Sequence, residues 1–527
     1  MADCLHFPVN MSVPNLSTKV PGPVTEILRK LLASGFEAHI VGGSVRDLLL
    51  DREPKDWDIA TNAKPDAVQT LFPESFYENV FGTVGIKVPR FSSKIPGKQD
   101  SIEEIVQVTT YRAESGYEDN RHPSDIIFVQ TIEEDLARRD FTMNAIALAI
   151  DGSLIDPFEG EIDIGKKLIR AVGNPESRFG EDALRMLRAV RFYAELRAST
   201  SLQKEPFMEP GNISSQLHSK SDWTIDSPTF DAIKSYAEKL QLISLERVSD
   251  EFSKIILSTS PAEGVDMLRC AKLLRYIIPE IEEGVGIGQN LHHIYTVYEH
   301  NLRALATCPS KKLDVRLAAL LHDVGKPRTK RGDGYKSTFY HHEHVGSRMT
   351  QTILTRLRLP SCVVSRATLL VDNHLFYYNV GEVTAASVRR LVKKVGLENM
   401  KDLMNIRIGD RLGSGTPKAK PYKLRHLEYM IEKVSKDPIS VKMLAINGND
   451  LMSLLGIVPG PKIGAILDVL LADVIENPER NTKPFLLERA RLLEQEDLDH
   501  LRILAKDTIK EKQDWDDQKI KGKHWVQ

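Results

Sequence analysis

The stretch from His39 to Thr61 reads HIVGGSVRDLLLDREPKDWDIAT and decides the fold of the first part of the chain. It predicts a strand, a glycine turn, a helix and a second strand. Gly42 and Gly43 allow close approach to the backbone. A helix that starts near Ser44 directs the positive end of its dipole at this turn, where phosphate commonly binds. The alternative is an ordinary Gly-Gly turn followed by a solvated acidic loop.

Two carboxylates stand on the second predicted strand. Asp56 and Asp58 are two residues apart, and this spacing puts both side chains on one face of a strand. Magnesium prefers oxygen ligands and bridges to substrate phosphates. A pair of such ions can clamp the attacking and the leaving oxygen of a nucleotidyl transfer. The order GG-x-x-R-D followed by D-x-D-x-A-T is much more specific than either half, and it predicts a nucleotidyltransferase with Mg²⁺ as cofactor.

Length and composition set broad limits. A chain of 527 residues is long enough for about three or four domains. The hydrophobic content of 41% and the charged content of 27% are ordinary for a globular protein. The formal net charge is −2, so a nucleic-acid partner must be held by a local basic face.

The sequence also bears on the compartment. Cys4, Cys270, Cys308 and Cys362 form no CxxC pair, which indicates a reducing compartment. No apolar run has the length of a membrane helix, and residues 1–20 lack the pattern of a secretory signal. We therefore expect a cytoplasmic protein with no membrane partner, while an organellar location and the oligomeric state stay open.

A polar triplet precedes the next apolar segment. Leu136 to Ile150 reads LARRDFTMNAIALAI and predicts an apolar helix that begins after Arg138, Arg139 and Asp140. The forked donors of arginine suit phosphate or sugar oxygens. Asn144 lies four residues after Asp140, on the same helical face. The alternative is a helix that Asp140 merely caps.

A second concentrated signal is Arg178 to Leu196, RFGEDALRMLRAVRFYAEL, in which Arg185, Arg188 and Arg191 recur on a predicted helix. Asp182 and Arg185 are helical neighbours. A carboxylate can accept from an exocyclic amine while a guanidinium donates to the adjacent ring nitrogen, and cytosine and adenine both offer this pattern. The pair could therefore select C and A. The alternative is a surface ion pair, which contributes about 0.2–0.5 kcal/mol.

Histidine and aspartate recur between His292 and Asp410. The candidates for metal ligands are His300, His322, Asp323 and Asp410, with His344 and His374 as weaker candidates. Such residues on successive helices can assemble a buried metal centre. A single buried histidine is more often a satisfied core residue, but several in this order favour a metal site.

Two segments lack an apolar period. Ala198 to Trp223 is rich in Ser, Pro, Gly and Gln and predicts a flexible insertion. Arg112 to Pro123 predicts a mobile loop near the site, although an ordinary surface loop would show the same pattern.

The chain resembles the class II tRNA nucleotidyltransferases, the CCA-adding enzymes, and the related bacterial-type poly(A) polymerases. It looks most like the subgroup with an HD domain, over about residues 24–495. The most specific motifs are VGGSVRD…DWDIAT, EEDLARRDFTMNAIA, GEDALRMLRAVRF, SLERVSDE and LLHDVGK. The resemblance implies an α+β fold: a small DNA-polymerase-beta-like nucleotidyltransferase head with a mixed sheet, followed by all-α neck, HD and C-terminal helical domains.

The same resemblance implies a division of the chain. Residues 24–160 would form the nucleotidyltransferase head. Residues 161–270 would form the neck, a nucleotide-selecting helical domain with the insertion 198–223. Residues 271–415 would form the HD domain, and residues 416–527 a C-terminal helical tRNA-binding domain with a charged tail.

Residue roles follow from the family motifs. Asp56 and Asp58 would be catalytic and hold Mg²⁺. The nucleotide-binding residues would be Gly42, Gly43, Arg46, Arg139, Asp140, Asp182, Arg185, Arg188 and Arg191. Among these, Gly43 and Arg46 would bind the triphosphate, Arg139 and Asp140 the sugar, and Asp182 and Arg185 would read C or A as a protein template. His300, His322, Asp323 and Asp410 would hold a second divalent metal.

One departure and one loop bear on the activity. Many family members carry a carboxylate where this chain has Gln107, which puts any third acidic group in doubt. The loop Arg112–Pro123 matches the flexible loop that the family needs to switch from C to A, and it disfavours a CC-only enzyme.

The expected function is template-independent addition of CCA to tRNA 3′ ends from CTP and ATP, with release of pyrophosphate. An A-adding enzyme or a poly(A) polymerase on the same fold is the alternative. An HD metal-dependent phosphohydrolase with an RNA-binding head is a rival of another class, as is a non-catalytic RNA-binding protein. The intact DWD motif disfavours both of these. In relatives, an HD domain can hydrolyse phosphoesters, so such an activity could accompany nucleotide addition.

Overall fold

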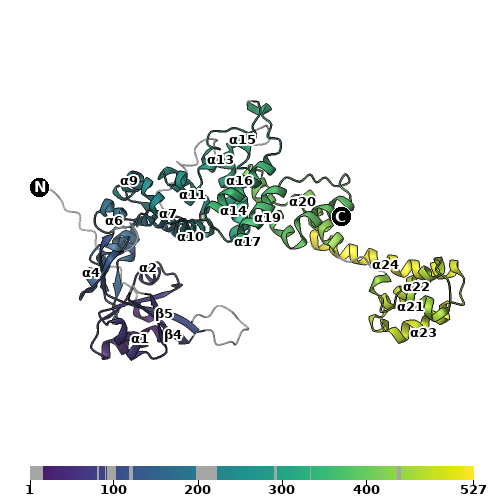
Figure 1. Cartoon of the computed structure of the whole chain (residues 1–527), viewed down its shortest axis with the longest axis horizontal. Helices are drawn as coiled ribbons and strands as arrows, with labels where there is room; N and C mark the ends of the chain where they lie inside the picture. Colours follow the sequence, from purple (N-terminus) through teal and green to yellow (C-terminus); the bar gives the residue numbers. More distant parts are fainter. Residues whose placement is uncertain are drawn as a thin grey trace. The chain divides into compact units, whose positions relative to one another are not determined.

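The computed structural model describes residues 16–79, 82–89, 91, 103–117, 123–197, 222–289, 294–332, 334–416, 418–435 and 441–526. The chain forms two compact units (Figure 1). The first comprises Met1–Val371 with Gly413–Gly415, and the second comprises Asp372–Leu412 with Thr416–Gln527.

The first unit begins with a seven-stranded sheet in the order β3-β4-β5-β2-β1-β8-β9. The strands are β1 Ala38–Val41, β2 Trp57–Thr61, β3 Ser75–Asn79, β4 Thr83–Pro89, β5 Glu103–Thr110, β8 Ala147–Leu148 and β9 Leu154–Ile155. β2 and β5 run parallel, whereas the other neighbouring pairs run antiparallel. This mixed sheet, followed by helices, confirms the predicted α+β class.

Short helices pack against this sheet: α1 Gly22–Ala33, α2 Gly43–Leu49 and α3 Pro65–Leu71. α1 buries Val24, Ile27, Leu28 and Leu31. That spacing is the apolar stripe of an amphipathic helix, so the face that packs on the sheet is set by the local sequence. The strand, turn, helix and strand predicted for 39–61 are present as β1, Gly42, α2 and β2.

The helix predicted within residues 136–150 is wrong. α4 spans Ile132–Ala137 and ends before Arg138, a 3-10 turn covers Thr142–Asn144, and β8 follows. β8 lies between β1 and β9 in the sheet, and its two residues are buried. A short apolar run fits a buried strand as well as a helix, and the periodicity cannot distinguish them.

The loop predicted for 112–123 is also wrong in part. β6 (Arg112–Tyr117) pairs with β7 (Pro123–Phe128) as an antiparallel hairpin. The two strands pair with each other, and half of the pairing partners lie from Pro123 onward. An apolar period within 112–123 alone therefore could not predict them. Residues 118–122 lie outside the described part of the chain, as do residues 198–221 of the predicted insertion. Trp223, at the end of that insertion, is buried.

Helices follow the head within the first unit. They are α5 Gly160–Gly165, α6 Pro175–Glu181, α7 Leu184–Leu196, α9 Ser227–Tyr236, α10 Leu245–Leu257 and α11 Pro261–Cys270, with the two-stranded sheet of β10 Leu168–Ile169 and β11 Thr224–Ile225. The helix that carries Arg185, Arg188 and Arg191 was predicted to have Glu181 and Asp182 in its first turn. It begins instead at Leu184, because Glu181 ends α6 and the chain is extended at Asp182, where φ is −141°. α7 packs against α10 and α11.

The histidine-rich region continues the chain with α12 Pro279–Glu282, α13 Val297–Thr307, α14 Leu313–Leu321, α15 Lys326–Thr329, α16 His342–Arg356 and α17 Ser361–Asn373. The helices of the second unit are α18 Ala385–Val395, α19 Leu397–Gly413, α20 Tyr422–Ser435, α21 Gly448–Leu455, α22 Pro461–Glu476, α23 Lys483–Leu493 and α24 Leu498–His524. Among the described residues, no helix combines the length and apolar character that a membrane span requires.

Candidate active site and a second metal-ligand cluster

The turn between β1 and α2 requires glycine at its first position. Gly42 has φ of +74°, a region that disfavours residues with a side chain. A Cβ added at Gly42 would also lie 2.9 Å from Nη1 of Arg139. Glycine therefore lets the Arg139 guanidinium pack over the turn, and both residues line one cavity.

Ser44 ties this turn to the strand with the two carboxylates. Its Oγ donates to the backbone oxygen of Asp56 at 3.1 Å and accepts from the backbone N–H of Asp58 at 3.3 Å. These bonds hold the start of α2 against the start of β2. The sequence pattern indicated Ser44 only as a helix start, and its linking role was not predicted.

Asp56 and Asp58 lie at the same cavity, as predicted. Within the described residues, no side chain or backbone group is bonded to the Asp56 carboxylate. Asp58 stands opposite Gln107 in the parallel pairing of β2 with β5. The family's missing carboxylate would thus stand on the strand next to Asp58, and this chain presents an amide there.

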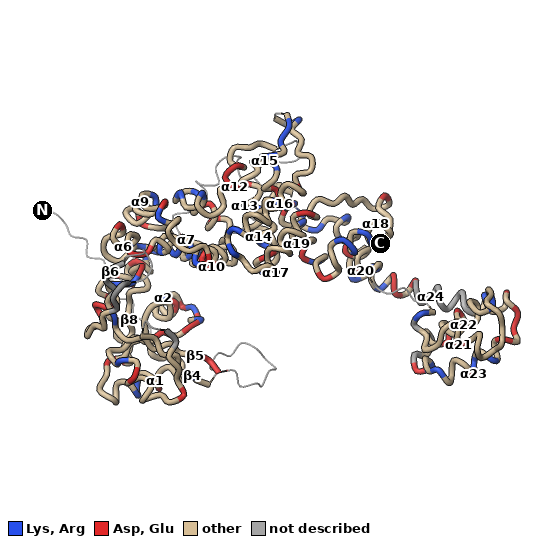
Figure 2. Tube along the Cα trace, in the orientation of Figure 1, with Lys and Arg blue, Asp and Glu red and all other residues tan. Residues whose placement is uncertain are grey.

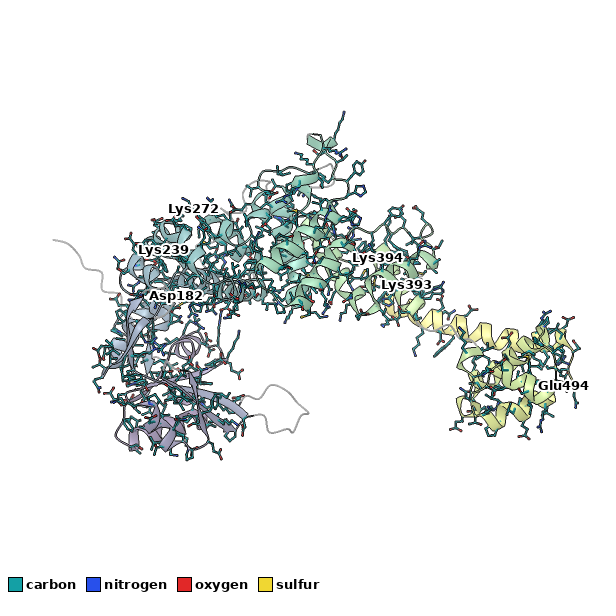
Figure 3. The ribbon with its side chains drawn as sticks, in the orientation of Figure 1. Asp182, Lys239, Lys272, Lys393, Lys394 and Glu494 are labelled. Carbon is teal, nitrogen blue, oxygen red and sulfur yellow. The ribbon has the colours of Figure 1, made fainter. Side chains whose placement is uncertain are left out.

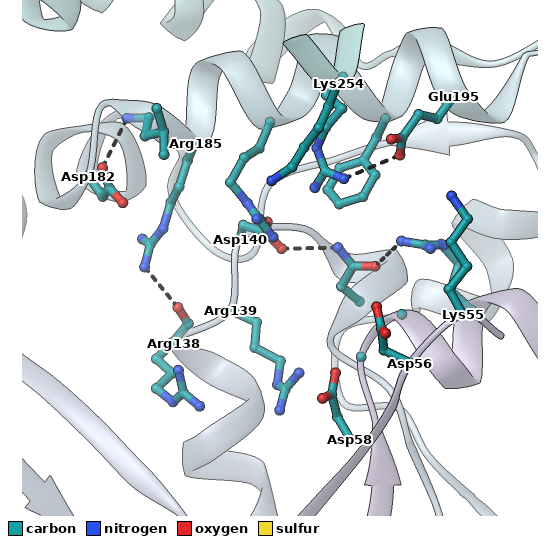
Figure 4. A pocket seen from close by; sticks show the side chains of 18 of the residues that line it. Lys55, Asp56, Asp58, Arg138, Arg139, Asp140, Asp182, Arg185, Glu195 and Lys254 are labelled. Atoms are coloured by element: carbon teal, nitrogen blue, oxygen red, sulfur yellow. Dashed lines mark hydrogen bonds and ion pairs between the residues drawn. The ribbon is translucent and has the colours of Figure 1, made fainter. Parts of the chain in front are cut away.

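The cavity has a volume of about 800 Å³ and joins the sheet to α7 and α10 (Figure 4). All nine predicted nucleotide-binding residues line it, together with Asp56 and Asp58. Ten of its lining residues are Lys or Arg, and five are Asp or Glu. This excess of cations suits a polyanionic ligand such as a nucleoside triphosphate.

Arg46 is held at the cavity wall by side-chain bonds. Its Nε and Nη2 donate to Oδ1 of Asp47 at 3.0 and 2.8 Å, and its Nη1 donates to Oδ1 of Asn144 at 2.9 Å. The guanidinium also lies 5.2 Å from the centre of the Phe192 ring. These contacts orient the guanidinium before any ligand arrives.

Asp135 is a buried carboxylate that was not predicted as a site residue, and it orients Arg138 and Arg139. Asp135 accepts from Nε and Nη2 of Arg138 at 3.0 and 2.8 Å and from Nη2 of Arg139 at 3.0 Å. Burial opposes ionisation of Asp135, but the two guanidiniums outweigh it and lower the pKa. Asp135 belongs to EEDLARRD, three and four residues before the arginines, which is the helical spacing of an ion pair.

Asp140 (Figure 4) forms an ion pair with Arg188 at the cavity wall. Its Oδ2 accepts from Nε of Arg188 at 2.7 Å, and its Oδ1 accepts from Nδ2 of Asn144 at 3.2 Å. The Asp140 side chain is only 8% exposed. Burial would raise its pKa, yet the charge and hydrogen bond of Arg188 and the bond from Asn144 lower the pKa to about 2. Asp140 is therefore a charged wall residue at neutral pH.

Asp182 and Arg185 each have a partner from elsewhere. Oδ2 of Asp182 accepts from Nη2 of Arg247 on α10 at 2.8 Å, and its Oδ1 accepts from the Leu184 N–H at 3.0 Å. Arg185 donates through Nη1 to Oε2 of Glu181 at 2.5 Å. Both side chains line the cavity. Asp182 is extended and precedes α7, so the prediction that the two are neighbours on one helical face is wrong.

Two of these contacts were not foreseen. Arg185 also donates through Nη2 to the backbone oxygen of Arg138 at 3.1 Å, which joins α7 to the end of α4 (Figure 4). Arg247 belongs to the motif SLERVSDE, but no role was predicted for it. Its place in a family motif, on the polar side of an amphipathic helix, could have indicated a functional residue.

Arg191 completes the wall beside the Phe192 ring. Its Nε lies 2.7 Å from Oε2 of Glu251, a carboxylate that is 4% exposed. Its guanidinium lies 4.3 Å from the centre of the Phe192 ring, and that of Arg188 lies 5.5 Å from it. α7 carries three basic residues, Arg185, Arg188 and Arg191, and Figure 2 colours basic positions blue. The guanidinium groups of Arg46, Arg188 and Arg191 therefore all lie close to one aromatic ring, that of Phe192.

A second cavity of about 490 Å³ adjoins the same carboxylates. It shares eight lining residues with the first cavity, among them Asp56, Asp58 and Lys254, and extends to Arg52. Its lining has five Lys or Arg residues and five Asp or Glu residues. The two carboxylates therefore lie where the two cavities overlap.

A separate cluster of potential metal ligands is buried between α13, α14 and α16. Nε2 of His300 lies 2.9 Å from Nε2 of His322, and Oδ2 of Asp323 lies 3.2 Å from the first nitrogen and 3.3 Å from the second. His342 joins them, with Nε2 at 3.2 Å from Oδ1 of Asp323. His344, the weaker prediction, is 53% exposed.

The ring nitrogens of this cluster are arranged as in a metal site. Nδ1 of His322 lies 2.8 Å from the Ala319 oxygen, and Nδ1 of His342 lies 2.7 Å from the Phe339 oxygen. Because a carbonyl only accepts, each Nδ1 carries a proton and the Nε2 of each neutral ring presents a lone pair. Metal-bound histidines use this same bond to a backbone carbonyl.

The remaining predicted ligands belong to the second unit. Asp410 lies on α19, where Oδ2 accepts from Nη1 of Arg407 at 2.7 Å. His374 follows α17 and is buried. Burial opposes the charge on Asp323, but the adjacent His322, Lys326 and His300 hold its pKa well below the usual range.

Known protein families match most of the chain. The poly A polymerase head domain matches residues 38–170, and the RNA and SrmB-binding site of polymerase A matches residues 222–284. The HD domain matches residues 267–405, and tRNA nucleotidyltransferase domain 2 matches residues 378–490.

Whole proteins match as well. The chain is 30% identical to a CCA-adding enzyme of Limosilactobacillus reuteri over 477 residues, which cover 90% of this chain and 97% of that enzyme. It is 39% identical to a CCA-adding enzyme of Lactobacillus helveticus over 269 residues, which span 49% of this chain and 58% of that enzyme. A crystal structure of the Bacillus stearothermophilus CCA-adding enzyme in complex with CTP is similar, with a TM-score of 0.56, 26% identity, and coverage of 90% of this chain and 100% of that one.

The mixed-sheet head, the paired carboxylates and the cationic cavity define a nucleotidyltransferase with an HD domain. Its relatives span almost its full length. The chain belongs to the CCA-adding enzyme family of tRNA nucleotidyltransferases. This confirms the family resemblance found in the motifs.

Proposed function

We propose that the protein adds C, C and A to the 3′ end of tRNA, using CTP and ATP and releasing pyrophosphate. The carrying observation is one cavity that has Asp56 and Asp58 at its sheet wall and Asp182 and Arg185 at its helical wall. Carboxylates for nucleotidyl transfer and a pair suited to C and A thus share one binding space. The family relatives support the same activity.

Asp56 and Asp58 fit a magnesium site. Both are oxygen donors beside a cavity rich in cations that would hold phosphates, and the Asp56 carboxylate has no competing partner among the described residues. Bound Mg²⁺ supplies Lewis-acid stabilisation of charge on phosphate oxygens. The two carboxylates would hold the ions, while Ser44 fixes the backbone that carries them.

The cationic residues would bind the triphosphate and sugar. Arg46 and Arg139 lie beside the Gly42 turn, and each is oriented by a carboxylate, Asp47 for the first and Asp135 for the second. A guanidinium oriented in advance loses little rotational freedom on binding phosphate. The tRNA 3′-hydroxyl would attack the α-phosphorus, and the bond to pyrophosphate would break.

The base would be read at the helical wall. A carboxylate has about four lone-pair sites, so Asp182 can accept from Arg247 and the Leu184 N–H and still accept from an exocyclic amine. Arg185 would donate to the adjacent ring nitrogen. Uracil and guanine present the opposite polarity and would leave a donor facing a donor.

The second cavity would receive the tRNA terminus. It includes the same carboxylates and carries Arg52, Lys55 and Lys254, which suit the phosphodiester backbone. Nucleotide and acceptor would therefore meet at Asp56 and Asp58, where the two cavities overlap.

The HD cluster would hold a second divalent metal through His300, His322 and Asp323, with His342 as a further candidate. The buried nitrogens and the carboxylate form the mixed donor set that transition metals prefer. Phosphoester hydrolysis at this cluster is the second activity that the family permits.

We also propose a cytoplasmic, reducing environment. The cysteines that the structure describes, Cys270, Cys308 and Cys362, are all free thiols. Disulfides are rare in such compartments, so free thiols of this kind fit it.

One experiment tests the function. Purified protein is incubated with tRNA that lacks its terminal CCA, with each NTP alone and with CTP plus ATP, and product lengths are read on a gel. Extension by about three nucleotides that requires both CTP and ATP supports the proposal. Long A tails would instead identify poly(A) synthesis, and no extension with any NTP would reject nucleotide transfer to tRNA.

A further inference from the structure

An apolar cavity of about 790 Å³ lies within the second unit. α19, α20 and the end of α24 line it, and none of its lining residues lines the nucleotide cavity or belongs to the HD cluster. Its apolar lining residues are Leu397, Met400, Met404, Ile431 and Trp525. A cavity with an apolar lining and a few charged groups is the usual form of a binding site.

The two long walls of this cavity are each one face of a helix. The lining residues of α19 are Leu397, Met400, Lys401 and Met404, at positions i, i+3, i+4 and i+7. Those of α20 include Arg425, Glu428, Glu432 and Ser435, at positions i, i+3, i+7 and i+10. Residues at these spacings lie along one side of a helix. The cavity is therefore a groove that follows both helices, and it runs for about 15 Å along α20 at a rise of 1.5 Å per residue.

The floor of the groove is aliphatic, and its edge carries an exposed tryptophan. Met400, Met404 and Ile431 are buried, whereas Leu397 and Trp525 are 51% and 79% exposed. The flexible thioether of methionine adapts to different apolar partners. A large exposed ring beside such a floor is typical of a surface that binds another protein.

The backbone of Trp525 is fixed at the edge of the groove, next to α20 (Figure 1). Its φ is +52°, a region that bulky residues rarely adopt. Its N–H donates to the Gly522 oxygen at 3.2 Å, and its own oxygen accepts from Nη1 of Arg425 at 3.2 Å. The next residue, Val526, is buried with Tyr429. A ligand that covers the ring therefore has little backbone to order.

The charges at the rim favour an acidic ligand. Glu428 already accepts from Lys420 at 2.7 Å. Glu432 already accepts from Lys523 at 2.8 Å. Arg425 keeps unused donor capacity, because its Nε makes no hydrogen bond within the described residues. The cationic side of the rim is thus available to a carboxylate from outside the chain.

We propose that this groove binds an acidic amphipathic helix of a partner protein. The apolar stripe of that helix would lie on Met400, Met404 and Trp525, and its carboxylates would face Lys401 and Arg425. Recognition of a helix in a groove requires an apolar channel parallel to helical walls, and the faces of α19 and α20 form one. A strand of RNA fits less well, since it stacks on several rings, whereas this floor is aliphatic and two carboxylates stand on the rim.

Fluorescence anisotropy with the full-length protein tests the groove. The probe is a fluorescein-labelled synthetic helix of about 14 residues, long enough to span the groove, with leucine at i, i+3, i+4 and i+7 and glutamate beside this stripe. We expect a Kd of the order of 10 μM, and the same helix with lysine in place of glutamate should bind at least about tenfold more weakly. Equal affinities of the two helices overturn the proposal.

Matched variants locate the binding site. Trp525→Ala should weaken binding of the acidic helix about tenfold, because it removes the exposed anchor. Trp515→Ala removes an exposed ring of α24 that does not line the groove, and it should bind like the unaltered protein. Lys401→Glu should weaken binding of the acidic helix, whereas Lys393→Glu, at an exposed lysine of α18 (Figure 3), should change it by less than about twofold. Equal affinities of Trp525→Ala and Trp515→Ala overturn the proposal.

Sedimentation velocity and competition distinguish the other occupants. A dimer of the unaltered protein that Trp525→Ala dissociates would assign the groove to a second copy of the chain and overturn the proposal. Displacement of the acidic helix by tRNA would assign the groove to RNA and overturn it as well. We expect Trp525→Ala to leave the sedimentation coefficient unchanged, and saturating tRNA to leave the affinity for the acidic helix unchanged.

Discussion

Arg247 on α10 holds the Asp182 carboxylate at 2.8 Å, although 65 residues separate them. The bond links α10 to the extended residue between α6 and α7, Asp182, which Figure 3 labels. The Asp182 side chain lines the cavity, and part of its carboxylate already accepts a hydrogen bond from Arg247. Nucleotide selection would therefore depend on a residue that does not itself need to contact the base.

Arg247→Ala should impair selection more than chemistry. Asp182 would lose its anchor and rotate, so the KM values for CTP and ATP should rise about tenfold and incorporation of UTP or GTP should become detectable. Arg247→Lys keeps the positive charge but not the forked guanidinium donors, so its KM values and its selectivity should be intermediate. Glu246→Gln, which alters an exposed pair with Arg358 on the same helix, is the control. Unchanged selectivity in Arg247→Ala would remove Arg247 from this role.

Asp58→Asn should reduce nucleotide addition about 10³-fold or more, because the loss of a metal-binding oxygen removes several kcal/mol of stabilisation. Circular dichroism should show an unchanged fold, and any phosphoesterase activity of the HD cluster should persist. Asp66→Asn, an exposed aspartate on α3, should behave as the unaltered protein does. Retention of addition by Asp58→Asn would contradict the metal assignment.

Gly42→Ala and Gly35→Ala separate backbone strain from close approach. Both glycines have positive φ, +74° and +84°, so each alanine should cost about 1 kcal/mol of stability. A Cβ at Gly42 would meet Arg139 at 2.9 Å, whereas nothing lies within 4 Å of one at Gly35. Only Gly42→Ala should lose activity, by up to about 10²-fold in kcat/KM. Equal activities in the two variants would show that this close approach has no role.

The Asp140–Arg188 pair should stabilise the protein above about pH 4. The pKa of Asp140 falls from an unfolded value of 3.8 to about 2, so its contribution is present above the unfolded pKa and disappears as the pH falls towards 2. The shift corresponds to about 2 kcal/mol at neutral pH. Thermal midpoints of Asp140→Asn should thus lie below those of the unaltered protein at pH 7 and converge with them near pH 2.

Asp51→Asn provides the control for that series. Asp51 is exposed and pairs with Lys19, so its thermal midpoint should follow the unaltered protein at every pH. A constant difference between Asp140→Asn and the unaltered protein from pH 7 to pH 2 would contradict the role of the Asp140 charge.

The HD cluster can be tested by metal content. His342→Ala should bind a divalent metal at least about tenfold more weakly, because a buried nitrogen beside Asp323 is lost. His344→Ala should bind it normally, since this ring is exposed. Metal per chain after dialysis, and the thermal midpoint with and without added metal, provide the readout. Equal metal content in both variants would exclude His342 as a ligand.

Local patterns predicted part of this site. The spacing of Asp56 and Asp58, the paired glycines and the family motif around Arg139 all led to residues that line the cavity. The reason is geometric: two residues apart on a strand means one face, and this relation needs no knowledge of the rest of the fold. The short apolar run after Arg139 led to a wrong prediction of a helix. It forms β8 instead, a buried strand that pairs with β1.

The sequence by itself determined the family, the mixed-sheet class and the set of side chains available for chemistry. Only the tertiary structure decided which of them meet: Arg247 with Asp182, Asp135 with two arginines, and His342 rather than the exposed His344 with Asp323. Periodicity specifies a face within one element. The contact between elements that are distant in the chain depends on how their cores pack, and no spacing along the sequence encodes that distance.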